Sequence, residues 1–395
     1  MADHDWQRDH ALLALRINRL VTGYSGGTAV IYRGPVEWSR QAESEPEPDP
    51  GRLADEAARL LESAPTAYLA AHVRAMRAVA LRLAGVRAPL PEYARQCLAC
   101  EVGWVPEETF ASAHDRLDAA LPPGPGPLAG RLASWARAHT LPDVERLPPL
   151  VALAVAETRA RTSAFVPLPP DEVVRCRLVS GVPFHAAGAY EGGVTSTIHV
   201  NRDLPFNLAD LLYVVAHEGH PGHIAESLLK EEHLAVGQGR TEQLVRFMLS
   251  PSFLVSEGIG LHAEEIAFPG GEAGEWLAGH VFPKTGITPH DADLAAIHRA
   301  RNALWGVWGN VALLADEGAP DRDLIAYLRR WGLHDDAEAA RALPLLRPSA
   351  MAPYIFGYYH GWRLLDGWLV APDRAARVRR LLTEQLLPGD LATTG

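Results

Sequence analysis

The feature that most constrains this chain is an apolar run followed at once by a cluster of metal-binding residue types. Residues 211–216 read Leu-Leu-Tyr-Val-Val-Ala, which is apolar around the whole circumference of a helix, so a helix here has to be buried on every side. Residues 217–223 read His-Glu-Gly-His-Pro-Gly-His. Imidazoles on a buried helix need partners, and neutral imidazole binds Zn²⁺ at about 2.0–2.1 Å. The run therefore predicts a metal site at the end of this helix.

The spacing of the histidines departs from the usual zinc-binding helix, H-E-x-x-H, in which two histidines one turn apart face the ion and the glutamate is the general base. Here the fourth residue after His217 is Pro221, whereas His220 is three and His223 six residues away. An undistorted helix holds positions 217 and 223 about 120° apart around its axis and about 9 Å apart along it, too far to share one ion. Pro221 and Gly222 favour a bend that would bring His223 back. His220 needs no bend, so both candidates for the second ligand stay open.

Around this motif the sequence resembles the large bacterial domain-of-unknown-function family numbered 885, with its H-E-x-x-P-G-H pattern, which looks like a distant relative of gluzincin metallopeptidases. The resemblance covers roughly residues 186–365. It rests on four blocks in the family's order: residues 197–201 (Thr-Ile-His-Val-Asn), 217–223, 257–264 (Glu-Gly-Ile-Gly-Leu-His-Ala-Glu) and 353–359, from a proline to a tyrosine.

The resemblance implies a gluzincin-like metallohydrolase fold with one Zn²⁺ ion. The ligands that it implies are His217, His223 and Glu257. It also implies Glu218 as general base and Tyr359 as the donor that stabilises the oxyanion.

Further residues are candidates for the surroundings of the ion. Glu257 and Glu264 are seven residues apart, so a helix starting after Pro251 would present both on one face, with Glu264 orienting a ligand histidine. If His220 is not a ligand, it is a candidate for a residue that surrounds the ligands or lines the pocket. Tyr358 belongs to a cluster of tyrosines that offers alternative oxyanion donors.

The substrate pocket has candidates with two interpretations each. Arg301 suits a substrate carboxylate, which would favour carboxypeptidase action, or an ordinary salt bridge on a helix surface. Trp305 and Trp308 either line a pocket or pack in the core. The β-rich segment that ends at Asn201 either pairs with an extended peptide or forms a core strand.

The rest of the chain has the apolar periodicity of a mainly α, multi-helix protein. Short β-branched stretches at residues 173–179 and 195–200 add a small sheet flanking the central helix. We expect an N-terminal helical region (1–166) and a metal-binding catalytic region (167–395), or one continuous domain. The expected helices cover residues 52–62, 65–84, 107–120, 128–139, 150–163, 207–231, 241–267, 291–316, 322–331, 350–369 and 372–386.

Composition limits the partners. The 395 residues include 37 Lys and Arg against 48 Asp and Glu, and the net charge of -11 repels phosphate backbones and anionic lipid. We therefore expect neither nucleic acid nor membrane as a partner. Three cysteines and a polar N-terminus without an apolar segment behind it favour the cytoplasm. The sequence leaves the oligomeric state open.

These observations predict a zinc-dependent hydrolase that cleaves a peptide or amide bond of a small substrate, with Glu218 activating the metal-bound water. Two alternatives stay open. One is a zinc hydrolase acting on a small-molecule amide or ester, and the other is a non-catalytic metal-binding scaffold.

Overall fold

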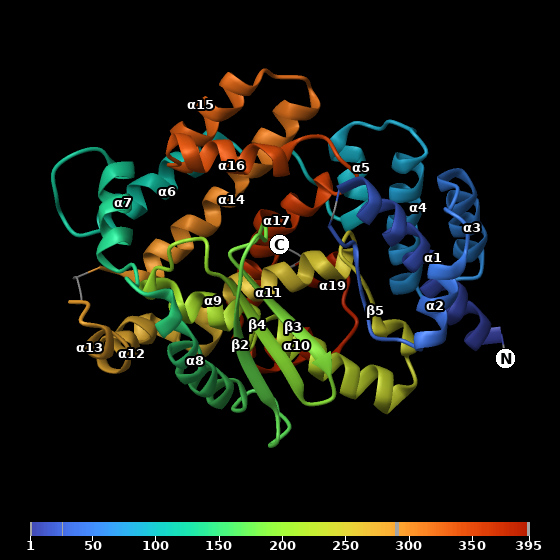
Figure 1. The fold of residues 1–395 in the computed structure, drawn as a ribbon, viewed down its shortest axis with the longest axis horizontal. Helices are drawn as coiled ribbons and strands as arrows, with labels where there is room; N and C mark the ends of the chain where they lie inside the picture. The colour runs from blue at the N-terminus through green and yellow to red at the C-terminus, as the bar shows by residue number, and fades with distance from the viewer. Residues whose placement is uncertain (1, 26, 289–291, 393–395) are drawn as a thin grey trace.

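The computed structural model describes residues 2–25, 27–288 and 292–392 and shows a mainly helical chain with two small sheets, as expected (Figure 1). The first hundred residues form a helical group at one end of the molecule, drawn in blue. Their hydrophobic residues share one core cluster with parts of the later helices. The elements of this group are α1 (Ala2–Ser25), β1 (Val30–Tyr32), α2 (Val36–Ser44), α3 (Pro50–Glu62), α4 (Ala67–Leu83) and α5 (Leu90–Leu98).

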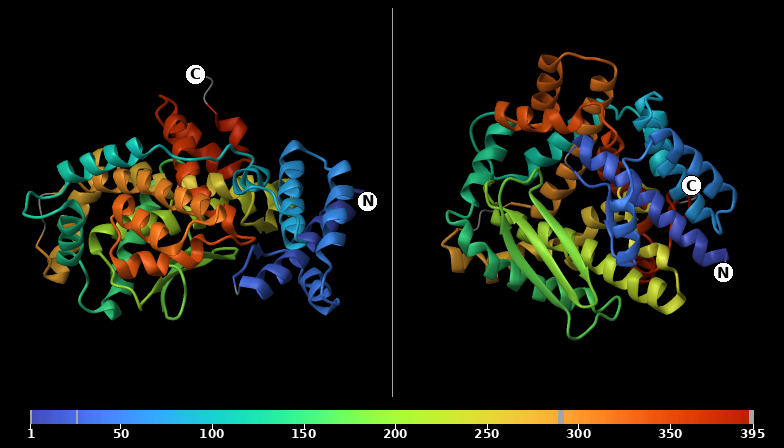
Figure 2. Two further views of the ribbon diagram at one scale, coloured as in Figure 1. Left: turned by 90° about the horizontal axis from the view of Figure 1, so that it is seen from above. Right: turned by 45° about the vertical axis from the view of Figure 1, so that its right-hand side comes forward.

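Three helices lead from this group to a three-stranded sheet. The helices are α6 (Glu107–Ala120), α7 (Leu128–Ala138) and α8 (Leu147–Thr162). The strands are β2 (Val173–Val179), β3 (Ala186–Gly192) and β4 (Thr195–Asn201), in the order β2-β4-β3. Strand β4 pairs in parallel with β2 and antiparallel with β3. Figure 2 shows this sheet on one face of the molecule, in front of the helices.

The second half of the chain supplies the central helices. Helix α9 (Leu211–Glu218) lies next to α11 (Pro251–Ala267), and α11 packs along α17 (Phe356–Leu369). The remaining elements are α10 (His223–Lys230), β5 (Val245–Phe247), α12 (Glu272–His280), α13 (Phe282–Thr285), α14 (Leu294–Asp316), α15 (Asp321–Gly332), α16 (Asp336–Leu346), α18 (Arg374–Thr383) and α19 (Pro388–Leu391).

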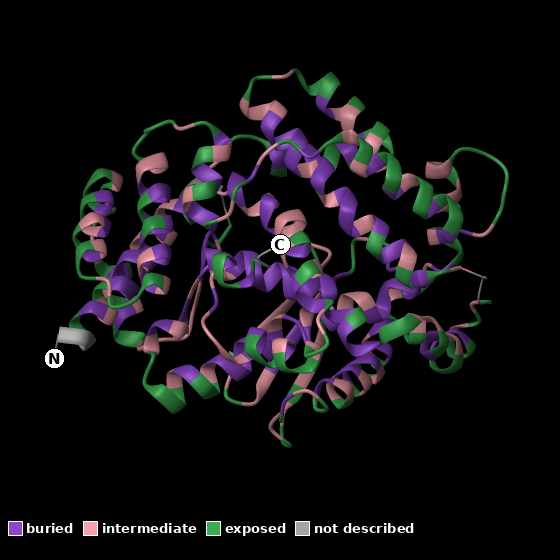
Figure 3. Cartoon of the chain, turned by 180° about the vertical axis from the view of Figure 1, so that it is seen from behind, coloured by how far each residue is buried: buried purple, intermediate pink, exposed green. Residues whose placement is uncertain are grey.

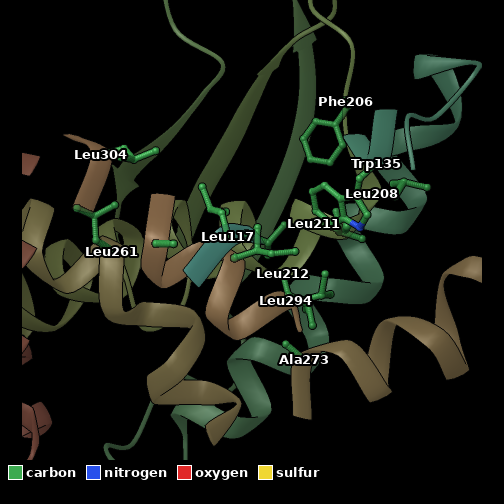
Figure 4. Packing of buried hydrophobic residues seen from close by; sticks show 14 of the residues in the cluster. Leu117, Trp135, Phe206, Leu208, Leu211, Leu212, Leu261, Ala273, Leu294 and Leu304 are labelled. Atoms are coloured by element: carbon green, nitrogen blue, oxygen red, sulfur yellow. The ribbon is translucent and has the colours of Figure 1, made fainter. Parts of the chain in front are cut away.

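The burial expected on every side of helix α9 holds for part of its circumference, since Tyr213 and Val214 are only partly buried. Leu211, Leu212 and Val215 have no exposed surface, and they belong to a core cluster with residues from α6, α8, the sheet and α14. Figure 4 shows Leu211 and Leu212 among the labelled residues of this cluster, and Figure 3 shows buried residues gathered along the central helices. This cluster takes residues from both sides of position 167, and the division into two regions stays a prediction.

Two of the expected helices are interrupted. The segment 207–231 divides into α9 and α10, with a break at residues 219–222. The segment 241–267 becomes helical only from Pro251, because residues 245–247 form β5, which pairs with β1 more than two hundred residues earlier. A three-residue strand whose partner is so distant leaves no local periodicity to recognise. Residue 291, where another helix was expected to start, lies outside the described residues.

None of the helices in the described ranges combines the length and the apolar character that crossing a bilayer would demand.

Candidate metal centre

The break between α9 and α10 turns the chain so that His217 and His223 face each other. Helix α9 ends at Glu218, and α10 begins at His223. The turn is tight at Gly222, whose N–H donates to the carbonyl of Ala216 at 3.0 Å. A Cβ atom at Gly222 would lie 1.8 Å from the carbonyl oxygen of His217, so only glycine fits here. The expected bend is therefore present.

Three side chains converge at this turn. His217 and His223 from α9 and α10 and Glu257 from α11 each offer a ligand atom, and these atoms lie within 4.8 Å of one another. The two imidazole rings are 4.7 Å apart between centroids and perpendicular. Nε2 of His217 is 3.5 Å from Oε2 of Glu257, and Nε2 of His223 is 3.8 Å from Oε1. Across the described ranges, no other trio of histidine, cysteine or acidic side chains is so placed.

The chemistry of the three side chains fits a zinc ion. The Glu257 side chain is only 2% exposed, and none of the described residues hydrogen-bonds to its Oε2 atom, which is costly for a buried carboxylate oxygen. Two imidazoles and one carboxylate are a known donor set for catalytic Zn²⁺, with a fourth position left for water. The two histidine side chains are 12% and 15% exposed, so solvent reaches the cluster.

The ionisation of Glu257 and His223 suits a cation as well. Burial opposes the charge of Glu257, but the two histidines lower its pKa below the ordinary value, so the carboxylate is ionised at neutral pH. Burial lowers the pKa of His223, which keeps this imidazole neutral and able to bind a metal. For His217 burial acts in the same direction, but the carboxylates of Glu257 and Glu218 outweigh it and raise the pKa.

Helix α11 also positions the His217 ring. The ring lies against Gly260, one turn after Glu257. A Cβ atom at Gly260 would lie 2.6–2.8 Å from three atoms of the ring. The glycine thus allows a ligand imidazole to lie directly on the helix that carries the carboxylate.

A buried polar chain holds the other imidazole. Nδ1 of His223 is 3.0 Å from Oγ of Ser256, and the Ser256 hydroxyl donates to Glu226. Glu226 in turn accepts from Lys230 at 2.8 Å and from Arg246 at 3.1 Å. Burial opposes the charge of Glu226, yet these two cations lower its pKa to about 2. Such a chain fixes the ring so that Nε2 faces the cluster.

Glu218 lies beside the cluster without belonging to it. Its Oε2 atom accepts a hydrogen bond of 2.7 Å from the N–H of Gly188, in the edge strand β3. The charge of Glu218 contributes to the raised pKa of His217, as expected for a carboxylate close to that ring.

Two tyrosines of the C-terminal cluster face the site, and a third does not. The Tyr354 hydroxyl donates to Oε1 of Glu257 at 2.7 Å. Burial raises the pKa of Tyr358 well above 10, and the charges of Glu257 and Glu218 add to the effect, so this hydroxyl keeps its proton. Tyr359 instead packs against His360 and Trp362. Consecutive residues on a helix point about 100° apart, which separates Tyr359 from the cluster.

His220 points away from the ligand cluster. Its Nε2 atom lies 2.9 Å and 3.1 Å from the two carboxylate oxygens of Glu172, and both side chains are fully buried. Arg159 adds a second ion pair to the same carboxylate at 3.0 Å. His220 thus connects the turn between α9 and α10 to the segment before β2. In the described part of the chain, its side chain does not belong to the candidate metal centre.

Glu264 and Asn201 also have other partners. Oε2 of Glu264 is 2.6 Å from Nδ1 of His298, so Glu264 orients this histidine and neither of the two ligand histidines. Asn201 donates to the carbonyls of residues 182 and 184 and accepts from the N–H of Asp203, which ties down the loops at the end of the sheet.

Arg301 lies in a neighbouring cavity of about 390 Å³, which Trp305 and Trp308 also line. Its Nη1 atom donates to Oδ1 of Asp210 at 2.8 Å, and its side chain is 41% exposed.

Sequence reasoning missed the residues that hold the ligands. Ser256 stands next to Glu257, and Gly260 follows Glu257 by about one turn. Helical spacing alone could have predicted that they lie on the same face of the helix. Glu226 follows His223 by one turn, but its partner Arg246 comes from β5, a strand that the sequence did not reveal. Contacts between such distant segments carry no signal in a single sequence.

Comparison with known proteins finds likeness in fold alone. No family model matches the chain, and no curated protein matches it. A crystal structure described as a putative lipoprotein from Colwellia psychrerythraea has a TM-score of 0.54 and 14% identity, over 95% of this chain and 67% of that one. A putative lipoprotein of unknown function from Shewanella oneidensis has a TM-score of 0.53 and 13% identity, over 97% and 72%.

These comparisons correct the resemblance stated above. The assignment to family 885, and through it to gluzincin metallopeptidases, is wrong, since no family model matches and the structural neighbours are putative lipoproteins, one of them of unknown function. The blocks that carried the resemblance are short, and a few histidines, glycines and glutamates can recur for reasons of local chemistry. The geometry of the cluster does not depend on that assignment.

Proposed function

We propose that the protein is a zinc-dependent hydrolase that cleaves a peptide or amide bond. The observation that carries the proposal is the convergence of His217, His223 and Glu257 on one point, with the carboxylate of Glu218 beside them. A bound Zn²⁺ would polarise the scissile carbonyl and lower the pKa of a water molecule to about 7. The three side chains would hold that ion.

Glu218 is the general base. Its carboxylate takes a proton from the attacking water as the oxygen bonds to the carbonyl carbon, and it delivers this proton to the nitrogen as the C–N bond breaks. The products are a carboxylic acid and an amine, so the atoms of one water molecule are consumed. The N–H of Gly188 holds one carboxylate oxygen and leaves the other for the water.

Tyr358 replaces Tyr359 as the proposed oxyanion donor. Its hydroxyl keeps its proton because burial raises its pKa, and the charges of Glu218 and Glu257 reach it. A protonated hydroxyl next to the developing negative charge is the donor that this step needs. Tyr354 has a different task, since it already donates to Glu257.

A small amide or ester is the second candidate substrate class. The cavity beside the site is about 390 Å³ and ends in aromatic walls, which suits a compact ligand as well as one residue of a peptide.

The cellular location also stays a prediction. The sequence favours the cytoplasm, whereas the description of both neighbours as putative lipoproteins favours a place outside it.

The Glu218→Gln variant tests the mechanism. With a panel of peptides and acylated amines, we expect a loss of about 10²- to 10⁴-fold in kcat with the zinc content unchanged, because the base does not bind the ion. Glu43→Gln, at an exposed position in α2, is the matched control and should keep full activity. If Glu218→Gln turns over every substrate as fast as the wild type, the proposed mechanism is wrong.

A further inference from the structure

The cavity that contains Arg301 lies next to helix α9, which carries His217. Tyr213, one turn before His217 on α9, forms part of its wall. A second wall residue, Trp305, stacks its ring on Tyr358 with 4.3 Å between centroids and 15° between planes. The charges of Glu218 and Glu257 also contribute to the raised pKa of Tyr358. Tyr213 from α9 and Trp305 from α14 therefore connect the wall of the cavity to the helices that carry His217 and Tyr358.

Arg301 is a fixed cation in this cavity with unused donors. Its Nη1 atom bonds to Asp210, and in the described part of the chain Nε and Nη2 form no hydrogen bond. Asp210 also lies 2.9 Å from His298, and this pairing helps to raise the pKa of His298 to about 9. The single negative charge of Asp210 is thus shared between two cations. It does not fully neutralise Arg301, which can still attract a further anion. Its side chain is 41% exposed although it starts from a buried part of α14.

The walls around the guanidinium are aromatic. Trp305 and Trp308 lie 5.3 Å apart between centroids, and Trp308 lies 5.6 Å from His334 on the far side. A flat or bulky apolar group packs favourably against such rings, while an arginine binds a carboxylate through two parallel hydrogen bonds. Both kinds of group occur together in an amino acid whose α-carboxylate is free and whose side chain is large and apolar.

We infer that Arg301 binds the free α-carboxylate on the amine half of the substrate, with the adjoining apolar side chain against Trp305 and Trp308. This inference rests on the proposed amide hydrolase function and names its substrate class. The substrates are N-acyl derivatives of aromatic or large apolar amino acids, or peptides that end in such a residue. An amide whose amine half lacks a carboxylate leaves the Arg301 donors without a partner.

Calorimetric titration tests the inference without relying on turnover. The zinc-loaded Glu218→Gln protein is titrated with N-acetyl-tryptophan, with glycyl-glycyl-tryptophan, and with the carboxamide of each. We expect each acid to bind about 10- to 100-fold tighter than its carboxamide, as a charged, forked hydrogen bond would give. The acid that shows the larger preference identifies the acyl amino acid or the peptide as the source of the carboxylate.

Variants at Arg301 assign the preference to this residue. In Arg301→Ala the acid should lose its advantage while the carboxamide binds as before, and Arg301→Lys should keep only part of the advantage because it lacks the forked geometry. The control is Arg363→Ala, an exposed arginine of α17 whose side chain contacts Asp366 and Trp362.

Equal binding of acid and carboxamide by the parent protein would overturn the inference, even if Arg301→Ala failed to fold. A preference that persists in a folded Arg301→Ala would overturn it as well. Failure of the proposed function gives a different result, namely no hydrolysis of any amide by the zinc-loaded wild type, whatever the binding preference.

Discussion

Both ligand imidazoles are held by residues of α11, the helix that also carries Glu257. Ser256 contacts Nδ1 of His223, and Gly260 gives the His217 ring room to lie flat. The polar chain continues from Ser256 to a glutamate that two cations stabilise. The positions of the candidate ligands therefore depend on residues outside the cluster, and this leads to a prediction at the level of one hydroxyl group.

Ser256→Ala removes that hydroxyl. The His223 ring loses the partner of its Nδ1 atom, and we expect zinc affinity to fall about 10- to 100-fold with little change in fold. Competition with a chelator measures the affinity, and circular dichroism monitors the fold. Ser112→Ala removes a comparable hydroxyl from exposed α6 and should bind zinc like the wild type. Unchanged affinity in Ser256→Ala would show that this contact does not support the ligand.

Single residues differ in how far the sequence predicts them. The motif singled out His217, Glu218 and His223, because their chemistry is concentrated in seven residues. The choice between His220 and His223 depended on the course of the backbone at Gly222, which no periodicity gives. Tyr358 and Tyr359 are neighbours, and only the rotation of α17 about its axis decides which one faces the cluster.

At the scale of elements, the site depends on a close approach between α9 and α11. The His217 ring takes the place where any residue other than glycine at position 260 would have its Cβ atom. Helix α14 adds a second connection, because His298 lies between Glu264 on α11 and Asp210 at the start of α9. Each contact leads to a prediction.

Gly260→Ala should displace the His217 ring, since the new methyl group would lie 2.6–2.8 Å from three of its atoms. We expect loss of stoichiometric zinc in a protein that still folds, measured by elemental analysis and circular dichroism. Gly279→Ala is the matched control, as a Cβ there meets nothing within 4 Å. It should leave zinc bound and raise the free energy of unfolding by about 0.4–1 kcal/mol. Full zinc content in Gly260→Ala would contradict the packing described.

His298 predicts a dependence of stability on pH. Burial opposes its charge, but Glu264 and Asp210 raise its pKa from 6.5 to about 9. Because the folded pKa lies above the unfolded one, the stabilisation is fully present below about pH 6.5 and is lost as the pH rises through 9. Its size is on the order of 3 kcal/mol for a shift from 6.5 to about 9.

Urea unfolding of the wild type and of His298→Gln at several pH values measures this effect. At pH 6 the wild type should be more stable than His298→Gln. The difference in the free energy of unfolding between the two proteins should shrink toward pH 10. If the difference between the two proteins stays constant over this range, the pairing of protonated His298 with Glu264 and Asp210 does not stabilise the fold.

At the scale of the whole molecule, the N-terminal helices and the helices around α9 meet along α11 and α17. Leu254 and Phe356 from these helices belong to the core cluster of α1–α5, while Leu261 and Trp362 belong to the cluster around α9. The mainly helical class and the small sheet were predictable from apolar periodicity and β-branched stretches. How the helices pack around α11 was not, because it depends on contacts between distant segments.

Zinc content tests the central claim most directly. Purified wild-type protein should bind one zinc per chain, and His217→Ala and Glu257→Ala should lose it. His220→Asn, whose wild-type side chain is paired with Glu172, should keep it, as should His233→Ala at an exposed position. A wild type that binds no zinc after incubation with the metal, or a His217→Ala variant that still binds one equivalent while His220→Asn binds none, would contradict the account.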